Sequence, residues 1–312
     1  TAMVALSDLV RAVHADVLID AQNAHLTKEE AEAYARTMVT FLALAVDRCA
    51  DFNNALTRWS SSNQKVMNLF GRQAVPMVWD FAEANILGTA VGAWETCNGY
   101  VAECIEVLCT NEQASAFAVQ DNAAESNSGG QGLLVSTDPP YYDNIGYAAL
   151  SDFFYVWLRR MVGALHVPLF DTVLVPKMPE LTASPELFDG DKEQAKRHFE
   201  QGFRQAFTSL RAHMDSRYPL TVYYAFKQED EEAVAFEEDQ SEGNGVDLTT
   251  GWETMLEALI SSGFTITATW PVRASQTWRM RAMGSNALAS YIVLACRPRP
   301  ADALRVGRNA FV

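Results

Sequence analysis

The sequence has no apolar run of the about 18 residues that a transmembrane helix requires, so we expect no membrane-spanning segment. It shows no signal-peptide pattern. Its five cysteines form no Cys-x-x-Cys pair, and its five histidines have no metal-ligand spacing. These absences predict a reduced, cytoplasmic protein without a metal site.

Basic residues are also scarce, with 24 Lys and Arg against 39 Asp and Glu and a net charge of −15. This balance argues at first against a nucleic-acid partner. However, residues 229–242 alone hold eight acids, and without them residues 131–312 carry a balance of +2. We expect 229–242 to be a solvated, mobile loop, which leaves a DNA-facing surface compatible with the rest of the second part.

Residues 1–130 read as a mainly helical region. Apolar residues recur at helical spacing over 2–14, Thr27 is a candidate N-cap for a helix to about Arg48, and a further helix is predicted over 94–108. The polar stretch 121–131 is rich in Gly and Ser and predicts a linker, so we place the domain boundary after residue 130. With 312 residues and 49% hydrophobic content, the chain can bury one large core or two smaller ones.

Residues 131–312 read as an α/β region. Strands are predicted over 133–137, 220–226, 264–270 and 289–296, and helices over 147–161, 191–214 and 250–262. Gly263 follows the last helix as a candidate C′ residue.

The four residues Asp138-Pro139-Pro140-Tyr141 end the first of these strands. The two prolines supply no backbone donors, so the strand must stop there. One carboxylate, prolyl carbonyl oxygens and one aromatic ring then face the space beyond the carboxyl end of the strand, where ligands bind in open α/β sheets. Such a set suits a planar group that bears an amino nitrogen. Taken alone, the four residues are also compatible with an ordinary strand-ending turn.

The second half of the chain resembles the amino-methyltransferases that use S-adenosylmethionine, in which an Asp-Pro-Pro-Tyr motif closes a strand of a Rossmann-like sheet. YYDNIGYAALSDFFYVWLRR (141–160), GRQAVPMVWDFAEAN (71–85) and GSNALASYIVLACRPR (284–299) are similar to large bacterial adenine-specific DNA methylases with a zinc ribbon. The resemblance covers roughly residues 30–300. It implies a bacterial or archaeal enzyme of restriction-modification or phage defence, with DNA as its partner.

The resemblance also implies roles for the motif. The Asp138 carboxylate and the Pro139 carbonyl would accept both hydrogens of an adenine amino group, with Pro140 completing the turn and Tyr141 stacking on the base. Asp138 and Pro139 would also border S-adenosylmethionine. Tyr142 and Asn144 are adjacent candidates for substrate contact, although Asn144 is equally a candidate N-cap of the next helix.

The loop 271–286 contains three arginines and a tryptophan but no acid. Cations beside an aromatic ring suit phosphate contact and base stacking, and a solvated loop that is basic by chance is the alternative. Ser285 and Asn286, just before the last strand, are predicted to border the space beyond Asp138–Tyr141. The candidate substrate-binding residues of this loop are Arg273, Trp278, Arg279, Arg281, Ser285 and Asn286.

The family pattern is broken in one respect, because the glycine-rich turn that holds the methionine end of the cofactor is missing. The nearest glycine pattern, 86–92, lacks paired close glycines and a strand before it. The chain therefore resembles the C-terminal portion of such an enzyme, and its α/β sheet is expected to be incomplete. We expect a second polypeptide or an N-terminal portion to supply the cofactor-binding half, since an unpaired apolar strand edge is a liability.

Two other functions are compatible with the same residues. The acceptor of the methyl group would then be RNA or a protein glutamine, or the chain would be a non-catalytic nucleic-acid-binding remnant.

Overall fold

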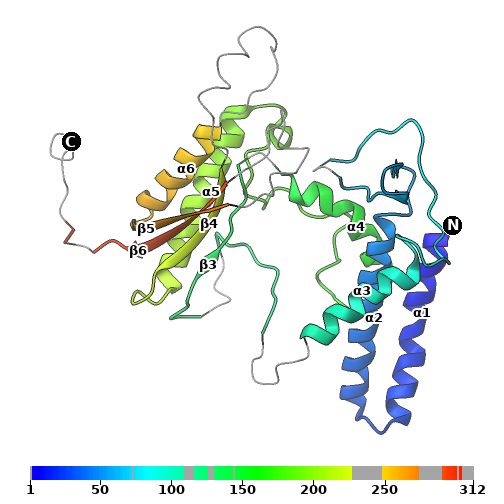
Figure 1. Ribbon diagram of the computed structural model, residues 1–312. Coiled ribbons are helices and arrows are strands. Elements are labelled where there is room, and N and C mark those ends of the chain that lie inside the picture. Colours follow the sequence, from blue (N-terminus) through cyan, green and yellow to red (C-terminus); the bar gives the residue numbers. More distant parts are fainter. Residues whose placement is uncertain are drawn as a thin grey trace. The chain divides into compact units, whose positions relative to one another are not determined.

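The computed structural model describes residues 2–71, 74–108, 116–125, 130–142, 145–226, 248–273, 290–300 and 302–303. The chain divides into two compact units: unit 1 is 1–120 with 146–177, and unit 2 is 121–145 with 178–312 (Figure 1). This division differs from a single boundary after residue 130, because residues 146–177 return to unit 1. None of the helices that the described residues form is long and apolar enough to cross a bilayer.

Unit 1 is built on a hairpin of two long helices, α1 (Ala2–Asn23) and α2 (Lys28–Ala50). The predicted cap is confirmed: Thr27 Oγ1 accepts from the Glu30 backbone N–H at 3.3 Å, and Glu30 Oε2 accepts from the Thr27 N–H at 2.9 Å. Small residues recur along the buried face of α2, which lets neighbouring helices approach closely. Those with no exposed surface are Ala31, Ala35, Val39, Ala43, Ala45, Val46 and Cys49.

Helix α3 (Trp94–Leu108) has the bounds that its periodicity predicts, and it packs on α2. Between α2 and α3 lies a hairpin of two-residue strands, β1 (Trp59–Ser60) and β2 (Lys65–Val66), which the sequence did not predict.

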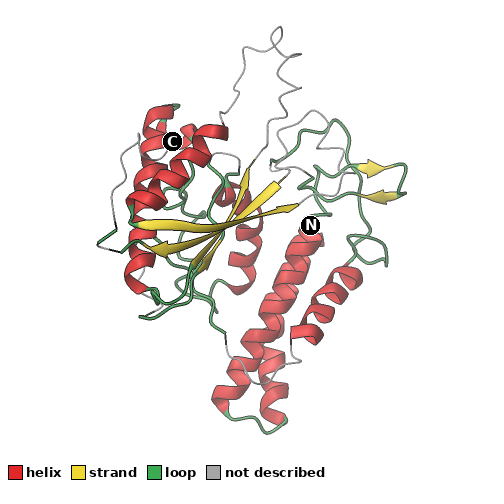
Figure 2. Ribbon diagram, turned by 60° about the vertical axis from the view of Figure 1, so that its left-hand side comes forward, coloured by secondary structure: helices red, strands yellow, loops and turns green. Residues whose placement is uncertain are grey.

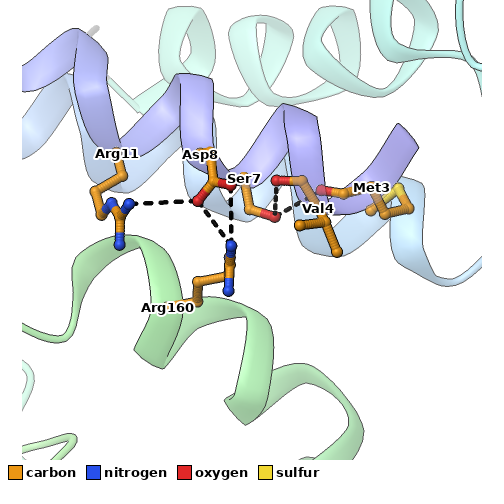
Figure 3. A network of polar contacts seen from close by, with 6 residues as sticks. All are labelled: Met3, Val4, Ser7, Asp8, Arg11 and Arg160. Carbon is orange, nitrogen blue, oxygen red and sulfur yellow. Dashed lines mark hydrogen bonds and ion pairs between the residues drawn. The ribbon is translucent and has the colours of Figure 1, made fainter. Parts of the chain in front are cut away.

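Helix α4 (Tyr147–Val162) was predicted as a helix, and it packs on α1 and α2. Tyr155 and Met161 on α4 are buried in the unit 1 core. At its edge, Arg160 Nη2 donates to both carboxylate oxygens of Asp8 at 2.8 and 2.9 Å (Figure 3). Both partners are partly exposed, so this ion pair contributes at most about 1 kcal/mol. The apolar contacts therefore account for most of the attachment of α4.

Unit 2 contains a four-stranded mixed sheet in the order β3-β4-β6-β5. Its strands are among those drawn in yellow in Figure 2. Strand β3 (Ser136–Thr137) is parallel to β4 (Leu220–Phe226), with Ser136 opposite Thr221. Strand β6 (Ser290–Pro298) is antiparallel both to β4 and to β5 (Phe264–Arg273). Unit 2 is thus an α/β unit, as predicted, with β4 at its predicted bounds.

Helices α5 (Lys192–His213) and α6 (Leu248–Ser261) cover one face of this sheet, and a short 3₁₀ helix, η1 (Pro185–Phe188), precedes α5. Phe199, Phe203 and Phe207 recur every four residues along α5 and are buried against the sheet. The core also takes alternate residues of the strands and the inner side of α6. These are Leu220, Val222, Tyr224, Leu294, Cys296, Phe264, Met255 and Leu259.

The opposite face of the sheet is largely apolar and exposed. Tyr223, Trp270 and Val272 point to it, and they are 42%, 54% and 47% exposed. Because α5 and α6 both lie on the first face, neither covers these side chains.

Candidate functional site

The Asp138–Tyr141 segment, called here the corner, follows the carboxyl end of β3. The chain before it runs alongside residues 213–222: Leu133 N–H donates to the His213 carbonyl at 3.1 Å, and Thr221 N–H donates to the Val135 carbonyl at 3.0 Å. The predicted strand therefore has the right course, but only its last two residues form regular strand. Among the described residues, β4 is the only strand that pairs with β3.

The carboxylate of Asp138 is exposed and is oriented from within the corner. The Tyr141 hydroxyl donates to Asp138 Oδ1 at 2.8 Å. No donor of the described residues reaches Asp138 Oδ2 or the Pro139 carbonyl oxygen. A carboxylate accepts several hydrogen bonds, so two acceptor atoms of the corner remain available to an incoming donor.

The ring of Tyr141 is fixed against the sheet. It meets the Tyr224 ring edge-on, with the centroids 5.6 Å apart, and Tyr224 is itself buried in β4. The hydroxyl bond to Asp138 and this ring contact together hold Tyr141 between the carboxylate and β4.

Tyr142 turns the chain back into unit 2 in a left-handed conformation, with φ +51°. Its ring meets Phe199 of α5 edge-on at 5.1 Å, and its carbonyl accepts from the Ala183 N–H at 3.1 Å. Near the start of α6, a Cβ on Gly251 would come within 2.9 Å of Tyr142 Cβ, so only glycine allows this approach. Tyr142 was predicted as a substrate contact, and the structure gives it these supporting contacts to α5 and α6.

The structure brings together Asp138, Pro139, Pro140, Tyr141 and Tyr142, and it does not place the other candidates. Arg273 is the last residue of β5, where its backbone pairs with Ser290, but its side chain lies outside the described part. The remaining candidates also lie outside the described residues: Asn144, Trp278, Arg279, Arg281, Ser285 and Asn286. The acidic run 229–242 lies outside them as well.

The glycine pattern 86–92 belongs to unit 1. Gly92 has φ +87°, and a Cβ there would meet Phe52 Cβ at 2.6 Å. Close packing therefore accounts for this glycine.

The supporting residues Gly251, Phe199, Ala183 and Tyr224 were missed as parts of the site. The one available signal was Gly251, a glycine inside the predicted helix 250–262, which often marks a close approach.

Unit 1 contains a carboxyl group that is buried in its core. Asp47 on α2 is 8% exposed, and its Oδ1 is buried without a hydrogen-bond partner among the described residues. Burial raises the pKa of Asp47 to about 8. The folded state therefore favours the neutral acid at this position.

The comparisons with known proteins add no relative to this picture. No family model matches the chain, and neither a curated protein nor a solved structure is similar to it.

Proposed function

We propose that this chain carries the methyl-acceptor half of an S-adenosylmethionine-dependent DNA methyltransferase that acts on the exocyclic amino group of adenine. The observation that carries the proposal is the corner itself. It offers two acceptor atoms that no donor of the described residues reaches, Asp138 Oδ2 and the Pro139 carbonyl oxygen, beside the ring of Tyr141 at the carboxyl end of β3. An amino group brings two hydrogens, and this pair of acceptors suits both.

The sheet supports the same proposal. After the corner, the chain of unit 2 forms a helix, a strand, a helix and a closing antiparallel pair, in the order that the resemblance implies. We propose that the sheet is the Rossmann-like sheet of a methyltransferase, and that the chain belongs to the family of zinc-ribbon DNA methylases.

The corner would act by positioning and polarising the amino group of the base. With both amino hydrogens held by Asp138 and Pro139, the nitrogen lone pair is drawn out of conjugation with the ring and turned away from the base. The Tyr141 hydroxyl keeps the carboxylate oriented for this contact. Bound here, S-adenosylmethionine would supply an electrophilic methyl group. Base extrusion from a duplex costs a few kcal/mol, and aromatic stacking of about 1–3 kcal/mol offsets part of it.

The cofactor-binding half is proposed to come from a second polypeptide or an N-terminal portion. Two observations support this: the chain lacks a glycine-rich turn, and β3 is paired on one edge only among the described strands. If the purified 312-residue chain is a folded monomer that binds S-adenosylmethionine at micromolar strength in calorimetry, this part of the proposal is wrong.

The test is methyl transfer by the full-length protein that contains this chain. Labelled S-adenosylmethionine is offered with duplex DNA, RNA or protein, and Asp138→Asn is compared with Asp20→Asn, the same change on an exposed carboxylate of α1. We expect label in adenine, a loss of about 10²-fold or more for Asp138→Asn, and no loss for the control. Undiminished labelling by Asp138→Asn contradicts the role of Asp138. If label is found only in RNA or only in protein, DNA is not the acceptor.

A further inference from the structure

The outer face of α5 carries a row of cations that the corner does not use. Its exposed residues at positions i, i+4, i+7, i+11 and i+14 lie on one side of the helix, opposite the buried phenylalanines. They contain no acid, and we call them the α5 stripe: Arg197, Gln201, Arg204, Thr208 and Arg211. The arginines recur every seven residues, which places them about 10 Å apart along the helix axis.

The arginines of the stripe, Arg197, Arg204 and Arg211, take part in no ion pair with a described residue. On α5 itself, Glu193 lies four residues before Arg197, and Glu200 lies one turn from both Arg197 and Arg204. Glu200 is paired with Lys196 at 3.9 Å, and neither acid forms an ion pair with the stripe. The exposed acids of the adjacent helix α6 are Glu253 and Glu257, and they form no ion pair with the stripe. In a chain with 39 acids and 24 bases, a row of three arginines without an ion pair to any described acid is unexpected.

A further arginine lies near the last arginine of the stripe. Arg211 Nη1 donates to the Ser262 carbonyl at 3.4 Å and lies against Gly263. The backbone N–H of Arg299 donates to the Gly263 carbonyl at 2.8 Å, and the Arg299 side chain is exposed. Arg211 and Arg299 therefore both lie at Gly263, at the same end of unit 2.

We propose that the α5 stripe binds the phosphate backbone of duplex DNA. Arg, Gln and Thr are donors that phosphate oxygens accept, and such contacts carry no sequence information. From Arg197 to Arg211 the stripe spans about 21 Å, or roughly six base pairs of a straight duplex. A straight row of charges on a rigid helix suits a stiff polyanion. The choice of DNA over another polyanion rests on the proposed function.

The stripe begins near the corner, because Phe199 of α5 contacts Tyr142, and it runs to the opposite end of the sheet at Gly263. A duplex held along it would be anchored outside the corner. The stripe therefore adds affinity without specificity.

The experiment compares two triple substitutions with the same change in charge. The stripe variant is Arg197→Gln with Arg204→Gln and Arg211→Gln. The control variant is Arg36→Gln with Arg58→Gln and Lys65→Gln, which removes three exposed cations of unit 1 that form no ion pair among the described residues. Binding of a labelled 20-base-pair duplex is followed by fluorescence anisotropy in 50–300 mM KCl. Circular dichroism melting tests whether both variants are folded. If the stripe variant is unfolded, the single variant Arg204→Gln is used in its place.

Each phosphate contact contributes about 0.9 to the slope of log K against log salt. We expect the stripe variant to lower this slope by about 2–3 and the affinity at 100 mM salt by on the order of 10²-fold, whereas Arg204→Gln alone lowers the slope by about 1. The control variant should bind almost as the wild type does. Equal losses in both triple variants would overturn the proposal, and so would an unchanged slope or no duplex binding by the wild type at 50 mM salt. A stripe-dependent preference for single-stranded RNA would overturn the choice of DNA.

This outcome is separable from that of the proposed function. Anisotropy requires no cofactor and no methyl transfer, so it reports binding along the stripe independently of the chemistry at the corner. Loss of methylation with retained stripe-dependent binding would contradict the methyltransferase and leave the stripe. Methylation by the wild type, together with no loss of affinity in the stripe variant, would contradict the stripe and leave the proposed methyltransferase.

Discussion

Asp47 makes the stability of unit 1 depend on pH in an unusual direction. A buried acid whose pKa is raised binds its proton more tightly in the folded state than in the unfolded chain. Its contribution is therefore most favourable at low pH, and stability is lost as the pH rises from the unfolded pKa, near 3.8, toward the folded pKa, near 8. Replacing Asp47 by Asn keeps the size of the side chain and removes the ionisation. We expect Asp47→Asn to stabilise unit 1 at neutral pH.

The size of the effect follows from the two pKa values. At pH 7, Asp47 of the unfolded chain is about three pH units above its pKa of 3.8 and is ionised, whereas Asp47 of the folded chain still holds its proton. At 1.36 kcal/mol per unit, this corresponds to about 4 kcal/mol of stability that the wild type lacks. For a unit of this size, the melting temperature should rise on the order of 10 °C.

The assay is calorimetric unfolding of the wild type and Asp47→Asn from pH 4 to pH 9. The difference between the two should be near zero at pH 4, grow up to pH 8 and level off above it. Asp16→Asn, a matched change on an exposed residue of α1, should show no such dependence. A difference that does not vary with pH, or a less stable Asp47→Asn at pH 7, would refute the reasoning.

Two glycine substitutions test the packing around the corner. In Gly202→Ala the new Cβ would lie 2.2 Å from Leu181 Cδ2, so we expect a loss of about 1–3 kcal/mol in urea unfolding, and restored stability with Leu181→Ala would locate the clash. In Gly251→Ala the new Cβ would lie 2.9 Å from Tyr142 Cβ, so the proposed methyl transfer should be slower per folded molecule. An unchanged rate per folded molecule would show that Tyr142 does not position the corner.

Elements whose own residues determine them were predicted closely. Helix α3 and strand β4 have their predicted bounds, and the cap at Thr27 is present, because periodicity and capping are local properties. Strand β3 is shorter than the run 133–137, because β4 begins only at Leu220 and Leu133 instead bonds to His213 and Asp215, which precede that strand. The packing of α4 on α1 and α2 was not predicted, since an amphipathic helix indicates a buried face but not its partner.

The site was predictable only where the chemistry is contiguous in the chain. Asp138 to Tyr141 are neighbours in sequence, and their donors and acceptors could be considered together. The contacts that support Tyr142 come from α5 and α6, and its positive φ has no signal in the residue type. The seven-residue spacing of arginines on α5 was readable beside its apolar face, but the sequence does not show whether acids of neighbouring elements pair with them.

The return of residues 146–177 to unit 1 decides how this chain can be divided in the laboratory. A fragment that begins at residue 131 would carry α4 with Tyr155 and Met161 stripped of the helices that bury them, and it would tend to aggregate. A single cut cannot separate the units. Replacing 146–177 by a short Gly-Ser bridge would instead leave unit 2 with its own core intact and the corner attached to its sheet.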